Sequence, residues 1–132
     1  MYLEHPSYDY LDFTYSSYGE FDIHRDYIRV RIYNFWVLAG FPNYERDVFF
    51  EEGFIIFHNV ISSKRTISEY IDQDREVMKP SYILNDYQHD SDSHNAYPCY
   101  LSGVFLTLNA WVDWDIVAKT ITIEVANRDN AL

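Results

Sequence analysis

The segment Thr120–Val125 reads TITIEV and is the cleanest alternation of apolar and polar side chains in the sequence. Ile121, Ile123 and Val125 recur at every second position, with threonine and glutamate between them. Side chains that alternate with a period of two point to opposite faces of an extended chain. The segment therefore predicts a half-buried β-strand near the C-terminus.

Three other segments carry the same kind of signal. Residues 28–32 and 100–110 alternate in hydrophobicity, and residues 54–61 are β-branched or aromatic almost throughout. Such residues fit the pleated, half-buried surface of a sheet. Residues 46–61 are therefore predicted to form either a hairpin or one long strand with a bulge at Gly53.

Other segments are predicted to lie outside the strands. The N-terminal 1–20 contains proline, serine and glycine and reads as an irregular segment in which a short strand over 8–15 is possible. Residues 66–75 have apolar side chains at the spacing of a short helix, with a continued strand as the alternative. The chain is predicted to leave the sheet at 62–65, to form a long polar loop at 85–98 and to bend at 112–115.

Strands that follow one another without crossover helices predict a mainly antiparallel sheet. The expected fold class is mainly β, with α+β possible: a curved sheet, a sandwich or a partial barrel with one or two short helices. With 132 residues the chain has the length of a single domain, 1–132. The predicted core consists of Ile28, Val30, Ile32, Phe35, Val37, Phe54, Ile56, Val104, Leu106, Leu108, Ile121, Ile123 and Val125.

The chain is strongly acidic, with a formal net charge of −11. Nucleic-acid and anionic membrane surfaces attract clustered lysine and arginine, so direct binding to either is not expected. A cationic partner, such as a basic protein surface, is favoured instead. A single cysteine, Cys99, and the lack of a signal peptide or a long apolar run lead us to expect a cytoplasmic protein.

The acidic residues are unevenly distributed. Residues 1–24 contain no lysine or arginine, and neither do the residues between Lys79 and Lys119. Both segments are rich in aromatic residues, which are common in protein interfaces. In an extended chain Trp111, Asp113 and Asp115 would share one face. The predicted partner-binding residues are Tyr8, Asp9, Tyr10, Asp12, Trp111, Asp113, Trp114 and Asp115.

One polar cluster contains ligand types that bind divalent metals. It consists of His89, Asp90, Asp92 and His94. Their spacing matches no closed metal-site motif, and a solvated polar loop is the alternative interpretation. No metal and no cofactor is assigned from the sequence.

No motif for a named reaction is present, so the protein is not predicted to be an enzyme. Asp113 with Asp115, and Glu51 with Glu52, supply paired carboxylates of the kind used in glycoside hydrolysis. Acids so placed in a sheet protein are commonly just solvated. Cys99 lacks the ordered partners that a thiol nucleophile requires.

The segments 54–60 and 101–118 belong to a small, acidic, aromatic-rich β chain that resembles the bacterial immunity proteins of polymorphic toxin systems. The resemblance implies a tight one-to-one complex that neutralises a toxin, often a nuclease. It carries over no functional residue and sets no oligomeric state. The alternatives are a phage-encoded inhibitor that mimics DNA, and a small-ligand-binding or hydrolytic β domain.

Overall fold

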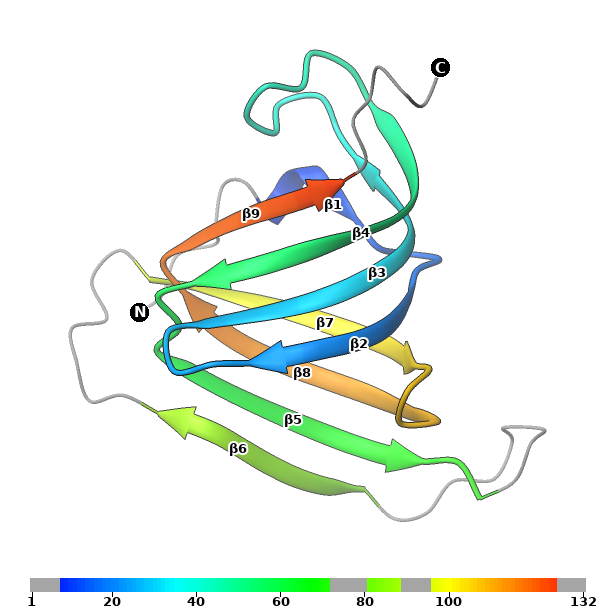
Figure 1. Cartoon of the computed structure of the whole chain (residues 1–132), viewed down its shortest axis with the longest axis vertical. Coiled ribbons are helices and arrows are strands. Elements are labelled where there is room, and N and C mark those ends of the chain that lie inside the picture. The colour runs from blue at the N-terminus through cyan, green and yellow to red at the C-terminus, as the bar shows by residue number, and fades with distance from the viewer. Residues whose placement is uncertain (1–7, 72–80, 89–95, 126–132) are drawn as a thin grey trace.

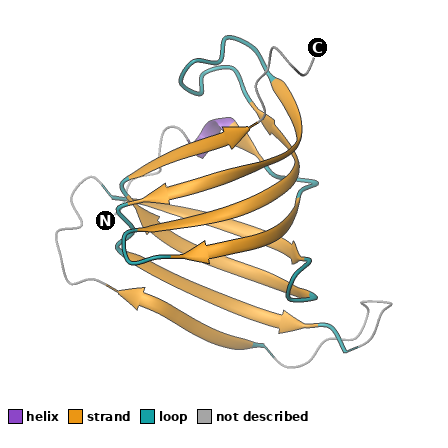
Figure 2. Cartoon of the chain, in the orientation of Figure 1, coloured by secondary structure: helices purple, strands orange, loops and turns teal. Residues whose placement is uncertain are grey.

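The computed structural model describes residues 8–71, 81–88 and 96–125, and the described chain is almost entirely β-strand (Figures 1 and 2). One short 3-10 turn, η1 (Tyr8–Tyr10), precedes the strands. The nine strands of the described residues are β1 (Leu11–Asp12), β2 (Ser17–Ile23), β3 (Tyr27–Val37), β4 (Val48–His58), β5 (Ser62–Glu69), β6 (Tyr82–Gln88), β7 (Tyr97–Phe105), β8 (Ala110–Ala118) and β9 (Thr120–Val125).

All nine strands belong to one sheet, in the order β6-β5-β8-β7-β2-β3-β4-β9, with β1 paired to β3. Every pairing is antiparallel except that of β2 with β7, which is parallel and rests on Tyr18 opposite Phe105. The predicted mainly β, antiparallel class is confirmed. The path begins at β6 and ends at β9, so the sheet is open and curved.

The sheet turns back on itself at two corners, where the chain passes from one half to the other. β4 leads into β5 at the first corner, where Asn59 has a positive φ of 53°, and β8 leads into β9 at the second. Hydrogen bonds from Ile61 N to Val117 O (2.7 Å) and from Lys119 N to His58 O (3.1 Å) join the two corners. In Figure 1 the half made of β9, β4, β3 and β2 lies in front, and β7 and β8 pass behind it at a steep angle. Strands that bend from one layer into another are typical of orthogonally packed sheets.

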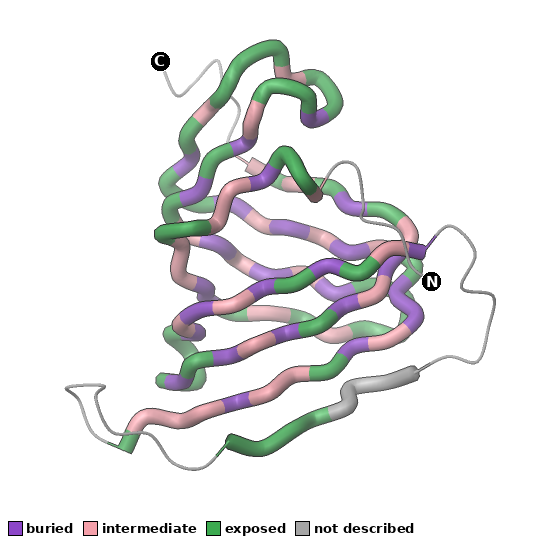
Figure 3. Tube along the Cα trace, turned by 180° about the vertical axis from the view of Figure 1, so that it is seen from behind, coloured by how far each residue is buried: buried purple, intermediate pink, exposed green. Residues whose placement is uncertain are grey.

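The core lies between the two halves and is rich in aromatic rings. Tyr18 of β2 stacks on Phe105 of β7 with ring centroids 4.7 Å apart, and Phe21 meets the edge of Trp114 at 5.2 Å. Buried and exposed positions alternate along the strands, as the tube in Figure 3 shows. Part of the aromatic content of the sequence therefore packs this core, while other rings, such as Tyr100 and Trp111, are exposed.

Six residues of the predicted core are fully or almost fully buried: Ile28, Val30, Ile32, Phe35, Val37 and Ile121. Ile123 and Val125 are partly buried and pack against that core. Phe54, Ile56 and Val104 were predicted inside but are only half-buried, because β4 and β7 turn their other faces inward. The buried residues of those faces are Ile55, Phe57, Leu101 and Phe105.

Several predicted element boundaries are wrong. Residues 62–65 do not leave the sheet, because they belong to β5. Residues 66–69 continue the same strand, which confirms the strand alternative for this segment rather than the helix, and 72–75 lie outside the described residues. Residues 112–115 lie in the middle of β8, and the turn comes earlier, at 106–109, where predicted core residues Leu106 and Leu108 are exposed.

The segments predicted to be irregular are shorter than expected. Within the predicted loop at 85–98, residues 85–88 belong to β6 and β7 begins at Tyr97. In the N-terminal segment, β2 already begins at Ser17, and the possible strand over 8–15 is reduced to the two residues of β1. Residues 1–7 and 89–95 lie outside the described residues.

Gly53 marks a close approach of two strands rather than a bulge. β4 is one long strand, as one of the two alternatives predicted, and its register with β3 runs without a shift through Gly53. A Cβ atom at this position would lie 2.8 Å from the backbone oxygen of Glu124 in β9. Glycine is therefore required here by space, since no side-chain movement relieves a clash with backbone.

Candidate functional site

Strand β8 separates its two tryptophans onto opposite faces of the sheet. Trp114 is fully buried and donates from Nε1 to Ser63 Oγ at 2.8 Å, whereas Trp111 is 39% exposed. The prediction that Trp111, Asp113 and Asp115 share a face is consistent with the burial pattern of the strand. The choice of Trp114 as a partner-binding residue is wrong, because its ring is part of the core.

Asp113 lies at the centre of a small hydrogen-bond network on the outer face of β7 and β8. Its Oδ1 accepts hydrogen bonds from Tyr100 Oη (2.7 Å), Ser102 Oγ (2.7 Å) and Trp111 Nε1 (3.3 Å). Partial desolvation favours the neutral carboxyl, but the three donors outweigh it and lower the pKa of Asp113 below its usual range. All three donors are neutral groups, so the carboxylate is held in place while its negative charge remains.

Asp115 is exposed on the same face, two residues further along β8. Its cross-strand neighbours are Tyr100 in β7 and Lys64 in β5, but no ion pair joins Asp115 to Lys64. The pKa of Tyr100 is raised, chiefly by its hydrogen bond to Asp113 and in smaller part by the charges of Asp113 and Asp115. Both carboxylates therefore lie close enough to Tyr100 to act on its phenol.

The segment before β1 reaches the same strand from its other side. The Tyr8 hydroxyl donates to Tyr100 O and accepts from Tyr100 N, the latter at 3.3 Å. Burial raises the pKa of Tyr8, which keeps the phenol protonated. Burial, together with the charge of Asp9, raises the pKa of the Cys99 thiol to about 12, which favours the protonated thiol. Asp9 lines the same cavity as Tyr100 of β7.

Asp12 and Tyr10 differ in what they contact. The Asp12 Oδ1 atom accepts from the backbone N and the hydroxyl of Thr14, at 2.9 and 2.5 Å, and these bonds lower the pKa of Asp12. A Cβ atom on Gly40 would lie only 2.5 Å from the ring of Tyr10. Tyr10 therefore packs on the turn that contains Gly40, and the structure does not bring it to the other predicted residues.

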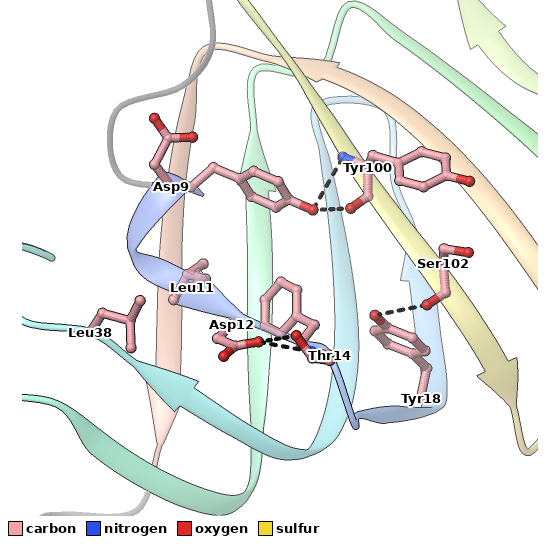
Figure 4. A pocket seen from close by; sticks show the side chains of 10 residues that line it. Asp9, Leu11, Asp12, Thr14, Tyr18, Leu38, Tyr100 and Ser102 are labelled. Carbon is pink, nitrogen blue, oxygen red and sulfur yellow. Dashed lines mark hydrogen bonds between the residues drawn. The ribbon is translucent and has the colours of Figure 1, made fainter.

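A cavity of about 460 Å³ lies between this N-terminal segment and β7 (Figure 4). Its walls include Asp9 and Asp12 on one side and Tyr100 and Ser102 on the other. Through Tyr100 the two acidic segments of the sequence meet in one place. We call this region the Tyr100 surface, and it comprises Tyr8, Asp9, Asp12, Tyr100, Trp111, Asp113 and Asp115.

A second group of acids, on the outer face of β2, β3, β4 and β9, is paired with arginine. Arg29 Nε contacts Glu124 Oε1 at 2.8 Å, and both Arg29 and Arg31 lie over the ring of Phe54. Arg31 also forms ion pairs with two further glutamates, one on each neighbouring strand. We call this region the arginine face, and it comprises Glu20, Arg29, Arg31, Glu52, Phe54 and Glu124.

Sequence reasoning missed the residues that join the site together. Neither Tyr100 nor Ser102 was among the predicted partner-binding residues. Their alternation in 100–110 was visible, but their place beside Asp113 depends on the register of β7 against β8. The contact of Tyr8 with Tyr100 spans 92 positions and leaves no local signal.

The metal-site prediction at His89, Asp90, Asp92 and His94 lies outside the described residues. Among residues 8–71, 81–88 and 96–125, no three histidine, cysteine or acidic side chains form a group that could hold a metal ion. Within the same ranges, no helix has the length and hydrophobicity to cross a membrane.

The resemblance to immunity proteins stays a prediction. Comparisons of the chain with protein-family models, with curated proteins and with solved structures found no match.

Proposed function

We propose that this chain is an acidic inhibitor that binds a basic protein, and that the partner is a bacterial toxin which it neutralises as an immunity protein. One observation supports this above all others. Asp9, Asp12, Asp113 and Asp115 lie on the Tyr100 surface, and none of them forms an ion pair with a described lysine or arginine. The acids of the arginine face, by contrast, are neutralised within the chain.

The Tyr100 surface combines the two properties that a fast and tight protein complex uses. Unneutralised carboxylates steer a positively charged partner and raise the association rate. Exposed rings then provide the buried anchors that slow dissociation, and Tyr100 and Trp111 are 48% and 39% exposed. We place this encounter in the cytoplasm, where an immunity protein meets a toxin that acts inside the cell.

The experiment that tests the proposal has two stages. The tagged chain is used to capture proteins from a lysate of its native host, and each captured protein is identified by mass spectrometry. Each is then expressed in a test strain with and without the chain. We expect a basic protein that stops growth alone and is tolerated when the chain is present. Captured proteins that are harmless by themselves would contradict the toxin part of the proposal.

The Tyr100 surface is tested with a charge-matched pair of variants. Asp113→Asn combined with Asp115→Asn should weaken binding of the captured partner by about tenfold or more and flatten its dependence on salt, because long-range attraction is lost. Glu45→Gln combined with Glu51→Gln makes the same change in net charge at exposed acids outside the surface. Equal effects of the two variants would show that only total charge matters. Asp115→Asn alone serves if the first variant is unstable.

A ligand-binding β domain is the second candidate function, and the 460 Å³ cavity favours it. Native mass spectrometry of the chain purified from its host tests this, since a carrier retains a molecule of defined mass. The DNA-mimic alternative relies on the same acids as the immunity proposal. A captured partner that is a host nuclease, encoded away from any toxin gene, would favour it.

A further inference from the structure

An open, solvent-accessible cavity lies under the N-terminal segment on the Tyr100 surface. Residues of η1, β1 and the turn after it form one wall, and β7 forms the opposite wall (Figure 4). A volume of about 460 Å³ lies in the lower part of the range of about 300–1,000 Å³ for small-molecule sites. The lining residues are Tyr8, Asp9, Leu11, Asp12, Phe13, Thr14, Tyr18, Leu38, Tyr100 and Ser102.

Much of the lining is aromatic or apolar. Tyr18 and Leu11 are buried, and Phe13 packs against the core ring of Phe35 with centroids 6.0 Å apart. The three phenol hydroxyls of the lining residues are already engaged: Tyr8 with the backbone of Tyr100, Tyr18 with the carbonyl of Ser102 at 3.5 Å, and Tyr100 with Asp113 Oδ1 at 2.7 Å. The cavity therefore offers ring and hydrocarbon surface rather than free phenols.

Among the described residues that line the cavity, every charged side chain is negative. Two carboxylates, Asp9 and Asp12, belong to this described lining, and it includes no lysine, arginine or histidine. The two Thr14 hydrogen bonds keep Asp12 ionised and fix its Oδ1 atom. An anionic ligand would be repelled here, and a neutral one would leave both carboxylates without a counter-charge.

A guanidinium group matches both properties at once. It is planar and weakly hydrated, it stacks on aromatic faces, and it donates hydrogen bonds to carboxylates in a fixed geometry. We propose that this cavity takes the guanidinium side chain of an arginine that the basic partner inserts between η1 and β7. This inference rests on the proposed function and names the chemical group of the partner that the cavity binds.

The direct test uses small probes and needs no partner. N-acetyl-arginine-N-methylamide is titrated into the ¹⁵N-labelled chain, alongside the citrulline analogue, which has the same shape without the charge. We expect the arginine probe to shift the amide signals of Thr14, Tyr100 and their neighbours, and the citrulline probe to shift them at least tenfold less at equal concentration. Equal responses to the two probes would overturn the proposal.

A matched pair of variants locates the binding. Asp12→Asn keeps an acceptor oxygen for Thr14 and removes only the charge, so the fold should persist. It should weaken binding of the arginine probe by about tenfold or more, because a hydrogen bond between two charged groups is replaced by one to a neutral amide. Glu45→Gln, at an exposed acid outside the cavity, should leave the titration unchanged. Equal weakening by both variants would contradict a site at the cavity.

Two further arms separate this proposal from its alternatives. Agmatine, a free guanidinium compound, distinguishes a small-molecule site from a side-chain site, because a cavity that binds agmatine and rejects the blocked arginine refutes insertion from a protein. If partner binding depends on Asp113 and Asp115 but neither the probe nor Asp12→Asn has an effect, the cavity proposal fails and the proposed function stands. If the probe binds and no captured partner depends on the Tyr100 surface, the proposed function fails, and with it the partner arginine.

Discussion

The Tyr100 surface and the arginine face both carry acidic side chains but hold them in different ways. On the arginine face, Glu20, Glu52 and Glu124 meet guanidinium groups, so their charges cancel within the molecule. On the Tyr100 surface, Asp113 is held by a phenol, a serine hydroxyl and an indole. Neutral donors fix the position of a carboxylate without consuming its charge. The acids of the arginine face are therefore used in ion pairs within the fold, whereas those of the Tyr100 surface keep a charge that a partner can bind.

The sharpest contrast can be made within strand β8. Trp114→Ala should destabilise the fold by about 3–5 kcal/mol, because it empties a fully buried site between the halves. Trp111→Ala, on the exposed side, should cost no more than about 1 kcal/mol while weakening partner binding. Urea unfolding followed by circular dichroism measures both losses. Similar losses at the two positions would contradict the assignment of the faces.

The charge of Asp113 should make stability depend on pH in acid. Since its pKa is lowered in the fold, its contribution is present above the ordinary aspartate pKa of 3.8 and is lost as the pH falls through the lower folded value. Asp113→Asn should therefore be less stable than the wild type at pH 7, on the order of 1 kcal/mol, and the difference should shrink below about pH 4. Denaturant titrations at a series of pH values measure this.

Asp115→Asn is the control for this series, because the Asp115 side chain is exposed and accepts no hydrogen bond from the described residues. Its stability should stay within about 0.5 kcal/mol of the wild type at every pH. If Asp113→Asn lowers the stability by the same amount at every pH, the shape of the side chain, rather than its ionisation, accounts for the effect.

The smallest effect is expected on the arginine face. Arg31→Gln removes two exposed ion pairs and one cation contact with Phe54, and exposed pairs contribute about 0.2–1 kcal/mol each. We expect a lowering of the melting temperature that is smaller than that of Asp113→Asn and that diminishes as salt is added. Thermal melts at low and high ionic strength test this. The matched variant is Arg46→Gln, at an exposed arginine with no ion pair to a described residue. An equally large loss of thermal stability in this variant would contradict the proposed difference between the two regions.

The fold class could be predicted because several strands alternate clearly. Where one face is polar, as in Thr120–Val125, the alternation also indicates the buried side. Where both faces are apolar, as in residues 54–57, alternation leaves two phases open, and the wrong one was chosen. The first half of β5 was missed, and its second half was left open between helix and strand, for the opposite reason: Ser62–Glu69 reads SSKRTISE, and hydrogen bonds to β6 and β8 keep this polar segment in the sheet.

The site was predictable only in pieces. The acids and Trp111 could be chosen from local composition, and their common face followed from the period of an extended chain. Which tryptophan is buried depends on the facing half of the sheet, so Trp114 was misassigned. The meeting of Asp9 and Asp12 with β7 depends on the contact of Tyr8 with Tyr100, and no pattern in either segment predicts it.

The Tyr8 hydroxyl binds both backbone groups of Tyr100, and this contact bears on the tendency of the sheet edge to aggregate. Strand edges with unsatisfied amides and carbonyls recruit strands from other molecules and so nucleate aggregates. Here β2 pairs with β7 only at Tyr18 and Phe105 among the described residues, which leaves part of β7 without a neighbouring strand. A phenol both donates and accepts, so one tyrosine can stand in for a peptide group and end the ladder there. The N-terminal turn thereby occupies the backbone groups of Tyr100 that a strand of a second molecule would otherwise bind.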